Sequence, residues 1–154
     1  MLSQKARYAL RALSSLAGLE PGARVQIAEI AAAARIPRKF LEQILLDLKK
    51  RGMVHSTRGK LGGYSLGRPA SGIQIAEVIR AIDGPLALSP CASRMAYRKC
   101  DDCADASTCA LRKVLLEVRN ATAAILERRS VASIVERRPP RSRDGGRGRH
   151  RRER

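Results

Sequence analysis

The sequence predicts a mainly α fold with one small β-hairpin, followed by a separate long helix. Trp is absent, and the chain has only one Phe and three Tyr. The core must therefore be built from Leu, Ile, Val and Ala, a composition that favours helices. Apolar residues recur at helical spacing in five segments, and one glycine-rich stretch with β-forming flanks interrupts them. With 154 residues, the chain supports one compact domain with an appended arm or tail.

Three segments in the first third of the chain predict helices. Residues 2–19 place Leu and Ala at intervals of three and four, and the sequence EPG ends this amphipathic pattern. A short second helix covers about Gln26–Ala34. Pro37 suits the first turn of a third helix, about Pro37–Arg51. We expect the third helix to bury its apolar side chains, which are Phe40, Leu41, Ile44, Leu45 and Leu48.

The next segment, MVHSTRGKLGGYSL, predicts two short strands around a basic, glycine-rich turn. Helix, helix, short turn, helix and hairpin is the order of a winged helix-turn-helix. In that arrangement the third helix enters the major groove of DNA, and the hairpin (the wing) reaches the adjacent minor groove. Lys39, near the start of the third helix, and Arg58, at the wing turn, lie where base-reading groups are expected.

The charge of the chain is strongly positive and uneven. The formal net charge is +17 at pH 7, and such a surface attracts polyanions, most commonly nucleic acid. Within residues 1–136, the stretch Arg35–Arg68 holds nine basic and two acidic residues. Basic residues on a helix often form only a solvated face, but their concentration around the hairpin favours DNA binding. Residues 137–154 contain nine Arg, two acids and no large apolar side chain, so we expect a disordered tail.

The sequence gives no sign of a membrane segment. No apolar run approaches the roughly 20 residues that cross a bilayer. Lys5, Arg7 and Arg11 interrupt the apolar residues at the N-terminus, which argues against a secretory signal. We therefore expect a cytoplasmic protein, in a compartment where disulfides are disfavoured.

Two further helices are predicted after the wing, at about Ile75–Ile82 and Ala110–Arg129. The second would be roughly 30 Å long, which exceeds what the small winged domain can cover. Its apolar residues step by four and three, and we expect the same helix of a second subunit to cover them. The stripe consists of Leu111, Leu115, Val118, Thr122 and Ile125, with Val114 and Ala121 alongside.

All four cysteines lie between Cys91 and Cys109, with the spacing C-x8-C-x2-C-x5-C. In a reducing compartment, clustered cysteines more often bind metal than form disulfides. The stretch lies between two predicted helices and is otherwise polar, so we expect a metal-binding loop.

Five segments together resemble one family: KARYALRALSSLA, IPRKFLEQILLDLKKRGMV, STRGKLGGYSL, IQIAEVIRAIDG and CALRKVLLEV. They make residues 1–136 similar to the Rrf-two family of bacterial winged-helix regulators, which includes the iron–sulfur cluster regulator and the nitric-oxide-sensing and iron-responsive repressors. The resemblance implies a homodimeric transcriptional repressor that binds a palindromic operator in double-stranded DNA. In members with cysteines, it also implies an iron–sulfur cluster that governs DNA binding.

The resemblance assigns DNA-reading roles to individual positions. Glu42 matches the acid of the recognition helix that can read a cytosine amino group, and Arg58 matches the wing arginine of the minor groove. The complete expected DNA-binding set is Arg38, Lys39, Glu42, Arg58, Lys60 and Tyr64.

The resemblance also assigns cluster ligands. Cys91 and Cys109 match the outer two ligands of the family. The middle ligand is open, because members usually carry three cysteines and this chain has four. Cys103 keeps the five-residue gap before Cys109 and is favoured, whereas Cys100 keeps the shorter gap after Cys91.

The fourth ligand departs from the family. Arg112 stands where the iron–sulfur cluster regulator has a histidine, and the region that holds an aspartate in the nitric-oxide sensor has Tyr8 and no acid. We therefore expect Cys100 as the fourth ligand of an all-cysteine site. Such a site suits either a 2Fe–2S or a 4Fe–4S cluster.

Other uses of the cysteines are less favoured. Structural zinc usually takes two paired ligands, and this chain has one C-x-x-C. The acidic sequence KCDDCAD disfavours a thiolate redox pair at Cys100 and Cys103. Free structural thiols tend to be buried, whereas this segment is polar. A zinc-stabilised or metal-free DNA-binding dimer remains the alternative.

The sequence gives no support for an enzyme. His55 and His150 are the only histidines, and no nucleophile–base pair, phosphate loop or nucleotide fingerprint is present. The expected organisation is a winged helix-turn-helix domain with a fourth helix (1–84), a cluster-binding loop (85–109), a dimerisation helix (110–136) and the Arg-rich tail (137–154).

Overall fold

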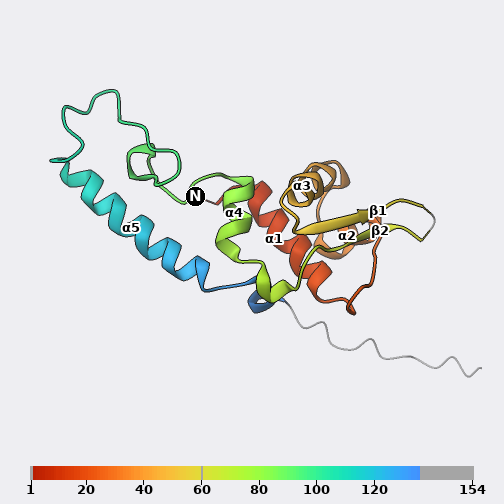
Figure 1. The fold of residues 1–154 in the computed structure, drawn as a ribbon. Coiled ribbons are helices and arrows are strands. Elements are labelled where there is room, and N and C mark those ends of the chain that lie inside the picture. The colour runs from red at the N-terminus through yellow and green to blue at the C-terminus, as the bar shows by residue number, and fades with distance from the viewer. Residues whose placement is uncertain (1, 60, 136–154) are drawn as a thin grey trace, which may run out of the picture.

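The computed structural model describes residues 2–59 and 61–135. These residues form five α-helices and one two-stranded antiparallel hairpin, so the predicted fold class is confirmed (Figure 1). The elements are α1 (Gln4–Ala17), α2 (Ile27–Ala34), α3 (Arg38–Lys50), β1 (Val54–Thr57), β2 (Gly63–Leu66), α4 (Ile75–Ile82) and α5 (Ala110–Glu127). Two short 3-10 turns lie before and after α5 in the chain: η2 (Pro90–Ala92), which the cysteine loop separates from α5, and η3 (Val131–Ile134). The predicted Arg-rich tail lies outside the described residues.

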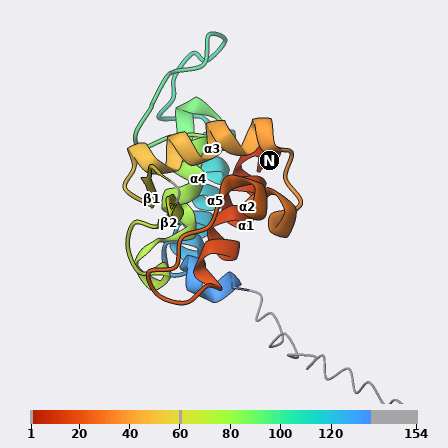
Figure 2. The same ribbon diagram turned by 90° about the vertical axis from the view of Figure 1, so that its right-hand side faces the viewer.

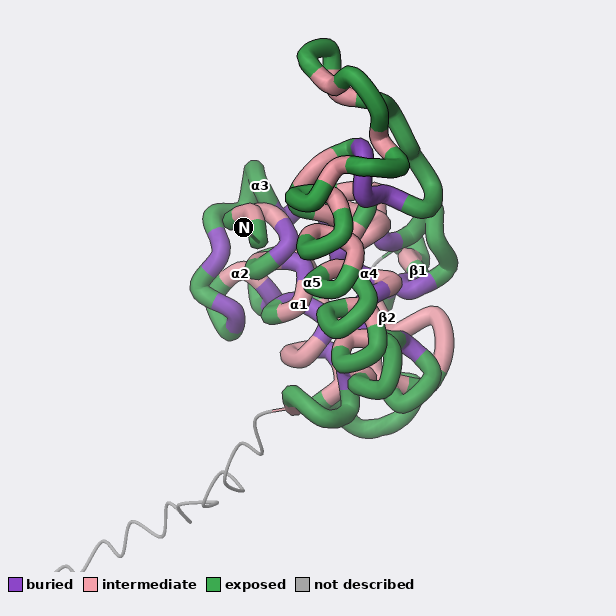
Figure 3. The backbone as a smooth tube through the Cα atoms, turned by 90° about the vertical axis from the view of Figure 1, so that its left-hand side faces the viewer, coloured by how far each residue is buried: buried purple, intermediate pink, exposed green. Residues whose placement is uncertain are grey.

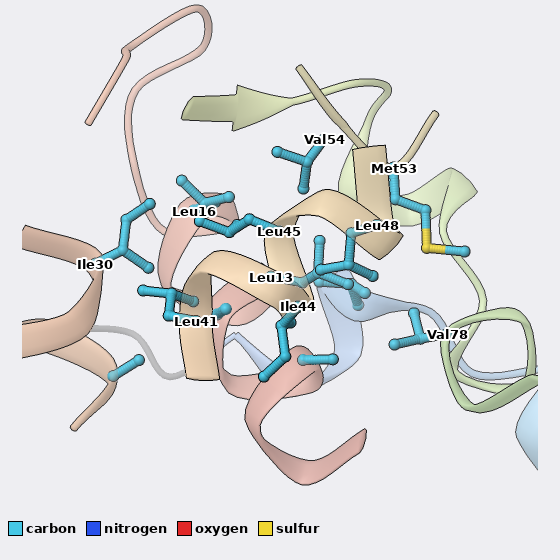
Figure 4. Close-up of a cluster of buried hydrophobic side chains, with 14 of the residues drawn as sticks. Leu13, Leu16, Ile30, Leu41, Ile44, Leu45, Leu48, Met53, Val54 and Val78 are labelled. Atoms are coloured by element: carbon cyan, nitrogen blue, oxygen red, sulfur yellow. The ribbon is translucent and has the colours of Figure 1, made fainter. Parts of the chain in front are cut away.

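Helix α1 is the centre of the core, and α2, α3 and α4 pack around it. The side of α1 that faces them is mostly small, so the neighbouring helices can approach closely. The buried residues of α1 are Ala6, Ala9, Ala12, Leu13 and Leu16. Four buried residues of α3 pack onto this surface, as Figure 4 shows: Leu41, Ile44, Leu45 and Leu48. The same cluster includes Met53, Val54 and Val78, and also Ile30, Ala34, Ile36, Ile73 and Val131.

The ends of α1 and α3 are set by capping. Helix α1 begins at Gln4, two residues later than its apolar pattern, because the Ser3 side chain accepts a hydrogen bond from the amide of Ala6. Leu2 therefore lies outside the helix and is exposed. Pro37 precedes α3 as its N-cap.

The prediction that α3 buries Phe40 is wrong, because 60% of that side chain is exposed. The buried face of α3 is centred between Leu41 and Leu48. At 100° per residue, Phe40 lies about 90° from that centre, in the first turn of the helix. Apolar character alone could not reveal this position at the edge of the face.

The wing is tied to the helical body through its second strand. Ser56 and Tyr64 face each other in the hairpin register. Tyr64 also exchanges two backbone hydrogen bonds with Val25, at 3.0 and 2.9 Å, which adds a short third bridge to the hairpin. The Gln26 side chain donates a hydrogen bond to the Gly62 carbonyl at 2.8 Å. The loop before α2 therefore fixes where the wing stands.

Helix α5 stands away from the rest of the fold (Figure 1). None of its eighteen residues, all of which the structure describes, is buried, and Figure 3 shows it in the exposed and intermediate colours only. Its C-terminal end is anchored by η3: the amide of Val131 donates to the Ile73 carbonyl at 2.8 Å, and Val131 is fully buried. At its other end, the long loop before α5 extends beyond the helical body (Figure 2).

Among the described residues, no helix combines the length and the apolar character that crossing a membrane requires.

We expect Gly63→Ala to destabilise the fold by roughly 1–3 kcal/mol. Gly63 has φ of +144°, and an added Cβ would lie 2.8 Å from the Val25 carbonyl oxygen. The variant must either strain β2 or break the bridge to Val25. Chemical denaturation followed by circular dichroism measures the loss.

Gly72→Ala is the matched control, because a Cβ at that position meets nothing within 4 Å and no positive φ is required. Equal denaturation midpoints for the two variants would show that the close approach to Val25 does not constrain the wing.

Candidate nucleic-acid interface and cysteine loop

Helix α3 presents a polar, exposed face opposite its buried one. Arg38, Lys39 and Glu42, three of the predicted DNA-binding residues, are all exposed, and their role in reading bases stays a prediction. The Arg38 Nε donates a hydrogen bond to Glu42 Oε1 at 3.3 Å. An exposed pair of this kind contributes only about 0.3–0.5 kcal/mol, so either side chain can exchange this partner for a DNA group.

The wing carries the second group of predicted DNA-binding residues. Arg58 is exposed and directly follows β1. Figure 1 shows the hairpin of β1 and β2 on the opposite side of the molecule from α5. Tyr64 is half-buried, and its ring packs against the core while its backbone bridges to Val25. Lys60 lies outside the described residues.

Two further side chains of α3, Gln43 and Phe40, lie on its exposed face or at the edge of that face, and neither is in the predicted DNA-binding set. Gln43 lies one turn after Lys39, and Phe40 is beside it. Together with Tyr8 of α1, they line an apolar depression of about 500 Å³. The signal for Gln43 was present in the sequence, because residues four apart on a helix share a face.

An acid within this basic surface is neutralised locally. Asp47 of α3 accepts a hydrogen bond from Lys5 Nζ at 2.8 Å and another from Gln43 at 3.1 Å. The Lys5 hydrogen bond lowers the pKa of Asp47 below its ordinary value, and the charges of Lys5 and Lys50 lower it further. The carboxylate therefore offsets part of the basic charge beside α3 and holds α1 and α3 together.

The four cysteines differ in their surroundings. Cys91 lies in η2 and is buried, whereas Cys100, Cys103 and Cys109 are half-buried. Cys109 is the N-cap of α5, and its sulfur accepts a hydrogen bond from the Arg112 amide at 3.4 Å. The loop thus begins beside the core and ends on the first turn of the exposed helix.

The structure places Cys100 beside Cys91. Ser89 Oγ lies 3.3 Å from Cys91 Sγ, and the hydrogen bonds from Ser89 and Cys100, with the charge of Arg112, lower the pKa of the Cys91 thiol. Donating to Cys91 raises the pKa of Cys100 in turn. Cys91 is therefore the thiol of the pair that more readily becomes the thiolate, the form that binds metals.

Cys103 connects to this pair only through the backbone, where its amide donates to the Cys100 carbonyl at 3.2 Å. The role of Cys103 as the middle ligand stays a prediction. Among the described residues, no three Cys, His, Asp or Glu side chains lie close enough to bind one metal ion.

Arg112 joins the two ends of the cysteine loop. Its Nε donates a hydrogen bond to the Cys91 carbonyl at 2.9 Å, while its backbone amide donates to the Cys109 sulfur. Its guanidinium also lies 5.7 Å from the centre of the Tyr97 ring. The sequence showed only a missing histidine at this position. The structure shows that the Arg112 side chain links the Cys91 backbone to the first turn of α5, which Cys109 caps.

The comparisons with known proteins agree with this architecture. The family model described as Rrf2, iron-dependent transcriptional regulator, matches residues 2–137. The chain belongs to the Rrf2 family. An rrf2-like HTH-type transcriptional regulator of Rhodobacter capsulatus is 49% identical over 121 residues, which cover 77% of this chain and 81% of that protein. An HTH-type regulator of Mycobacterium tuberculosis is 49% identical over 86 residues, covering 56% of this chain and 53% of that protein.

Two solved Rrf2 structures share the fold. CymR, the global cysteine regulator of B. subtilis, has a TM-score of 0.70 and 25% identity, covering 88% of this chain and 95% of CymR. IscR of T. potens has a TM-score of 0.67 and 25% identity, covering 88% of this chain and 85% of IscR. Because the relatives are transcriptional regulators, this Rrf2 protein is a DNA-binding transcriptional regulator and not an enzyme.

Proposed function

We propose that this Rrf2 protein is a homodimeric repressor of a palindromic operator and that a cysteine-ligated iron–sulfur cluster reports iron, redox state or nitric oxide to it. One observation carries the proposal. The loop with all four cysteines ends on the first turn of α5, and Arg112 of α5 reaches back to Cys91. A group bound by this loop would act directly on the helix that we assign to dimerisation.

The four cysteine thiols are the type of ligand that an iron–sulfur cluster takes. Cys91 and Cys100 lie beside each other, and the Arg112 side chain links the Cys91 backbone to the first turn of α5, which Cys109 caps. With Cys103, the loop offers the four thiolates that 2Fe–2S and 4Fe–4S clusters take. When bound, such a cluster supplies a centre that is sensitive to oxidants, nitric oxide and iron supply. Arg112 places a positive charge beside the thiolates and offsets their mutual repulsion.

The DNA surface follows from α3 and the wing. Arg38 and Lys39 lie at the N-terminal end of α3, where the helix dipole also favours phosphate. We assign Glu42 to a cytosine amino group and Arg58 to the minor groove. Lys60 would add a further charge at the wing, and the Arg-rich tail would add affinity without sequence preference through counterion release.

The exposed face of α5 supports a homodimer. Four of its large apolar side chains are 41–66% exposed: Leu111, Val114, Val118 and Ile125. A single chain leaves them in water, whereas a second copy of α5 would bury them. Two paired copies would present two α3 helices to half-sites about one DNA turn apart. The same dimer with zinc, or without metal, is the alternative.

Arg58→Ala should weaken specific operator binding by about 1–3 kcal/mol, because the variant loses its minor-groove contact. Fluorescence anisotropy on a duplex selected from a random pool measures the loss.

Glu42→Ala should instead reduce the difference in binding affinity between the selected duplex and a scrambled one. The variant loses its contact with the cytosine, and removing an acid also relieves repulsion from the phosphates. The same anisotropy measurement on both duplexes tests this.

Lys113→Ala, on exposed α5, removes the same charge as Arg58→Ala far from the wing and serves as its control. If Arg58→Ala and Lys113→Ala bind the selected duplex equally well, the wing does not read DNA.

Val118→Asp should convert the dimer into a monomer, because a carboxylate would enter the apolar interface between the α5 helices. Sedimentation velocity measures the change. Lys113→Asp adds the same carboxylate at a polar position of α5 and should remain dimeric. A dimeric Val118→Asp protein would exclude the α5 interface.

Cys91→Ser and Cys109→Ser should each lose the visible chromophore and the acid-labile sulfide, because serine is a far poorer ligand for iron. Anaerobic purification, an absorbance spectrum and an iron and sulfide assay measure the loss. Comparing Cys100→Ser with Cys103→Ser decides the middle ligand, and loss in both assigns an all-cysteine site.

Ser89→Ala is the matched control, since it removes a hydrogen bond to Cys91 without removing a sulfur. A colourless parent protein with stoichiometric zinc would overturn the cluster and favour the zinc-stabilised dimer.

A further inference from the structure

A cavity of about 380 Å³ lies between α4, the segment 85–95 and α5, and none of the described residues that line it is a cysteine or a predicted DNA-binding residue. This volume falls within the range of about 300–1,000 Å³ that is typical of small-molecule sites. The apolar residues that line the cavity include Pro85, Leu86 and Ala123. Its lining also includes several polar side chains, three of which are arginines.

The three arginines come from three different segments. Arg80 belongs to α4, Arg94 to the cysteine loop and Arg119 to α5. Glu127 is the one acidic residue among those that line the cavity, and Arg80 already forms an ion pair with it. The positive charges of Arg94 and Arg119 are therefore not balanced by an acid of the cavity wall.

Two donors of this cavity have unused hydrogen-bonding capacity. The Nε of Arg119 is buried and has no hydrogen-bond partner among the described residues. A buried donor without a partner costs free energy, and an acceptor brought in by a ligand would remove that cost. The buried Ser93 hydroxyl accepts from the Ala96 amide at 3.0 Å, which leaves its own proton free to donate.

We propose that this cavity binds a small organic anion through a carboxylate or phosphate group. Arginine presents a planar fork of donors that matches both oxyanions. Arg119 and Arg94 would hold the oxyanion, with the Ser93 hydroxyl as a further donor, and the apolar residues of the lining would contact the carbon skeleton. The site is separate from the proposed cluster and uses none of its candidate ligands.

The proposed dimer leaves this site open. On α5, the exposed apolar residues Leu111, Val118 and Ile125 lie on one side, and the cavity residues Arg119 and Ala123 lie on another. At 100° per residue, the centres of these two groups are roughly 120° apart. A second copy of α5 on the apolar side would therefore not cover the cavity.

The position of the site allows a bound anion to contact both the cysteine loop and α5. Arg94 lies three residues after Cys91, and Arg119 lies ten residues, nearly three helical turns, after Cys109. An anion held by both would tie the cysteine loop to the middle of α5.

Isothermal titration of the reduced full-length protein with citrate and with inorganic phosphate, at ionic strength held constant with chloride, tests the proposal. We expect saturable binding of at least one anion, and the preferred one distinguishes a carboxylate site from a phosphate site. Arg119→Gln should weaken that binding about tenfold or more, as expected for a lost charged hydrogen bond. Arg94→Gln, at an exposed position that the fold does not need, should also weaken it.

Lys113→Gln removes the same charge from α5 outside the cavity and should bind as the parent does. Hydrogen exchange should slow in the peptides around 93–96 and 119–124 when the anion is present. Absence of saturable binding by both anions would overturn the proposal. Equal weakening in Lys113→Gln and Arg119→Gln would also overturn it, because binding would then follow total charge.

Discussion

The packing of α3 against α1 is the contact on which the rest of the structure depends. Leu41, Ile44, Leu45 and Leu48 are fully buried, and each such side chain contributes about 1.5–3 kcal/mol. The exposed ion pair of Arg38 and Glu42 contributes about 0.3–0.5 kcal/mol. Apolar burial therefore fixes the rotation of α3 about its own axis. Because the apolar face of α3 is buried against α1, the basic residues of α3 face the solvent. Their orientation does not depend on ion pairs.

The two ends of α5 are held in different ways. At its C-terminal end, Val131 is buried and backbone hydrogen bonds join Ile73 to Val131 and Ile75 to Arg129. At its N-terminal end, the helix meets the cysteine loop through Arg112 and Cys109. A change in that loop would thus act on the less firmly held end of a rigid element. This arrangement suits a regulator in which the spacing of two α3 helices sets operator affinity.

The cysteine loop has almost no apolar core of its own, so polar contacts determine its shape. Ser89 lies beside the Cys91 sulfur, Arg112 donates to the Cys91 backbone carbonyl, and a hydrogen bond with Cys100 also lowers the pKa of Cys91. Metal ligands are commonly oriented by groups that do not bind the metal themselves. Arg112 has that relation to the proposed site, although at the level of sequence it appears only as the replacement of a histidine.

The sequence by itself determined the order of helices and hairpin, the buried face of α3 apart from Phe40, and the family. Those features follow from periodicity and turn chemistry within short segments, which are local. Only the tertiary structure decided that Cys100 rather than Cys103 lies beside Cys91, and that Arg80, Arg94 and Arg119 surround one cavity. Cys91 and Cys100 are 9 positions apart along the chain, and Arg80 and Arg119 are 39 positions apart. Their proximity depends on how the loop and α5 return to α4, a geometry that no local pattern encodes.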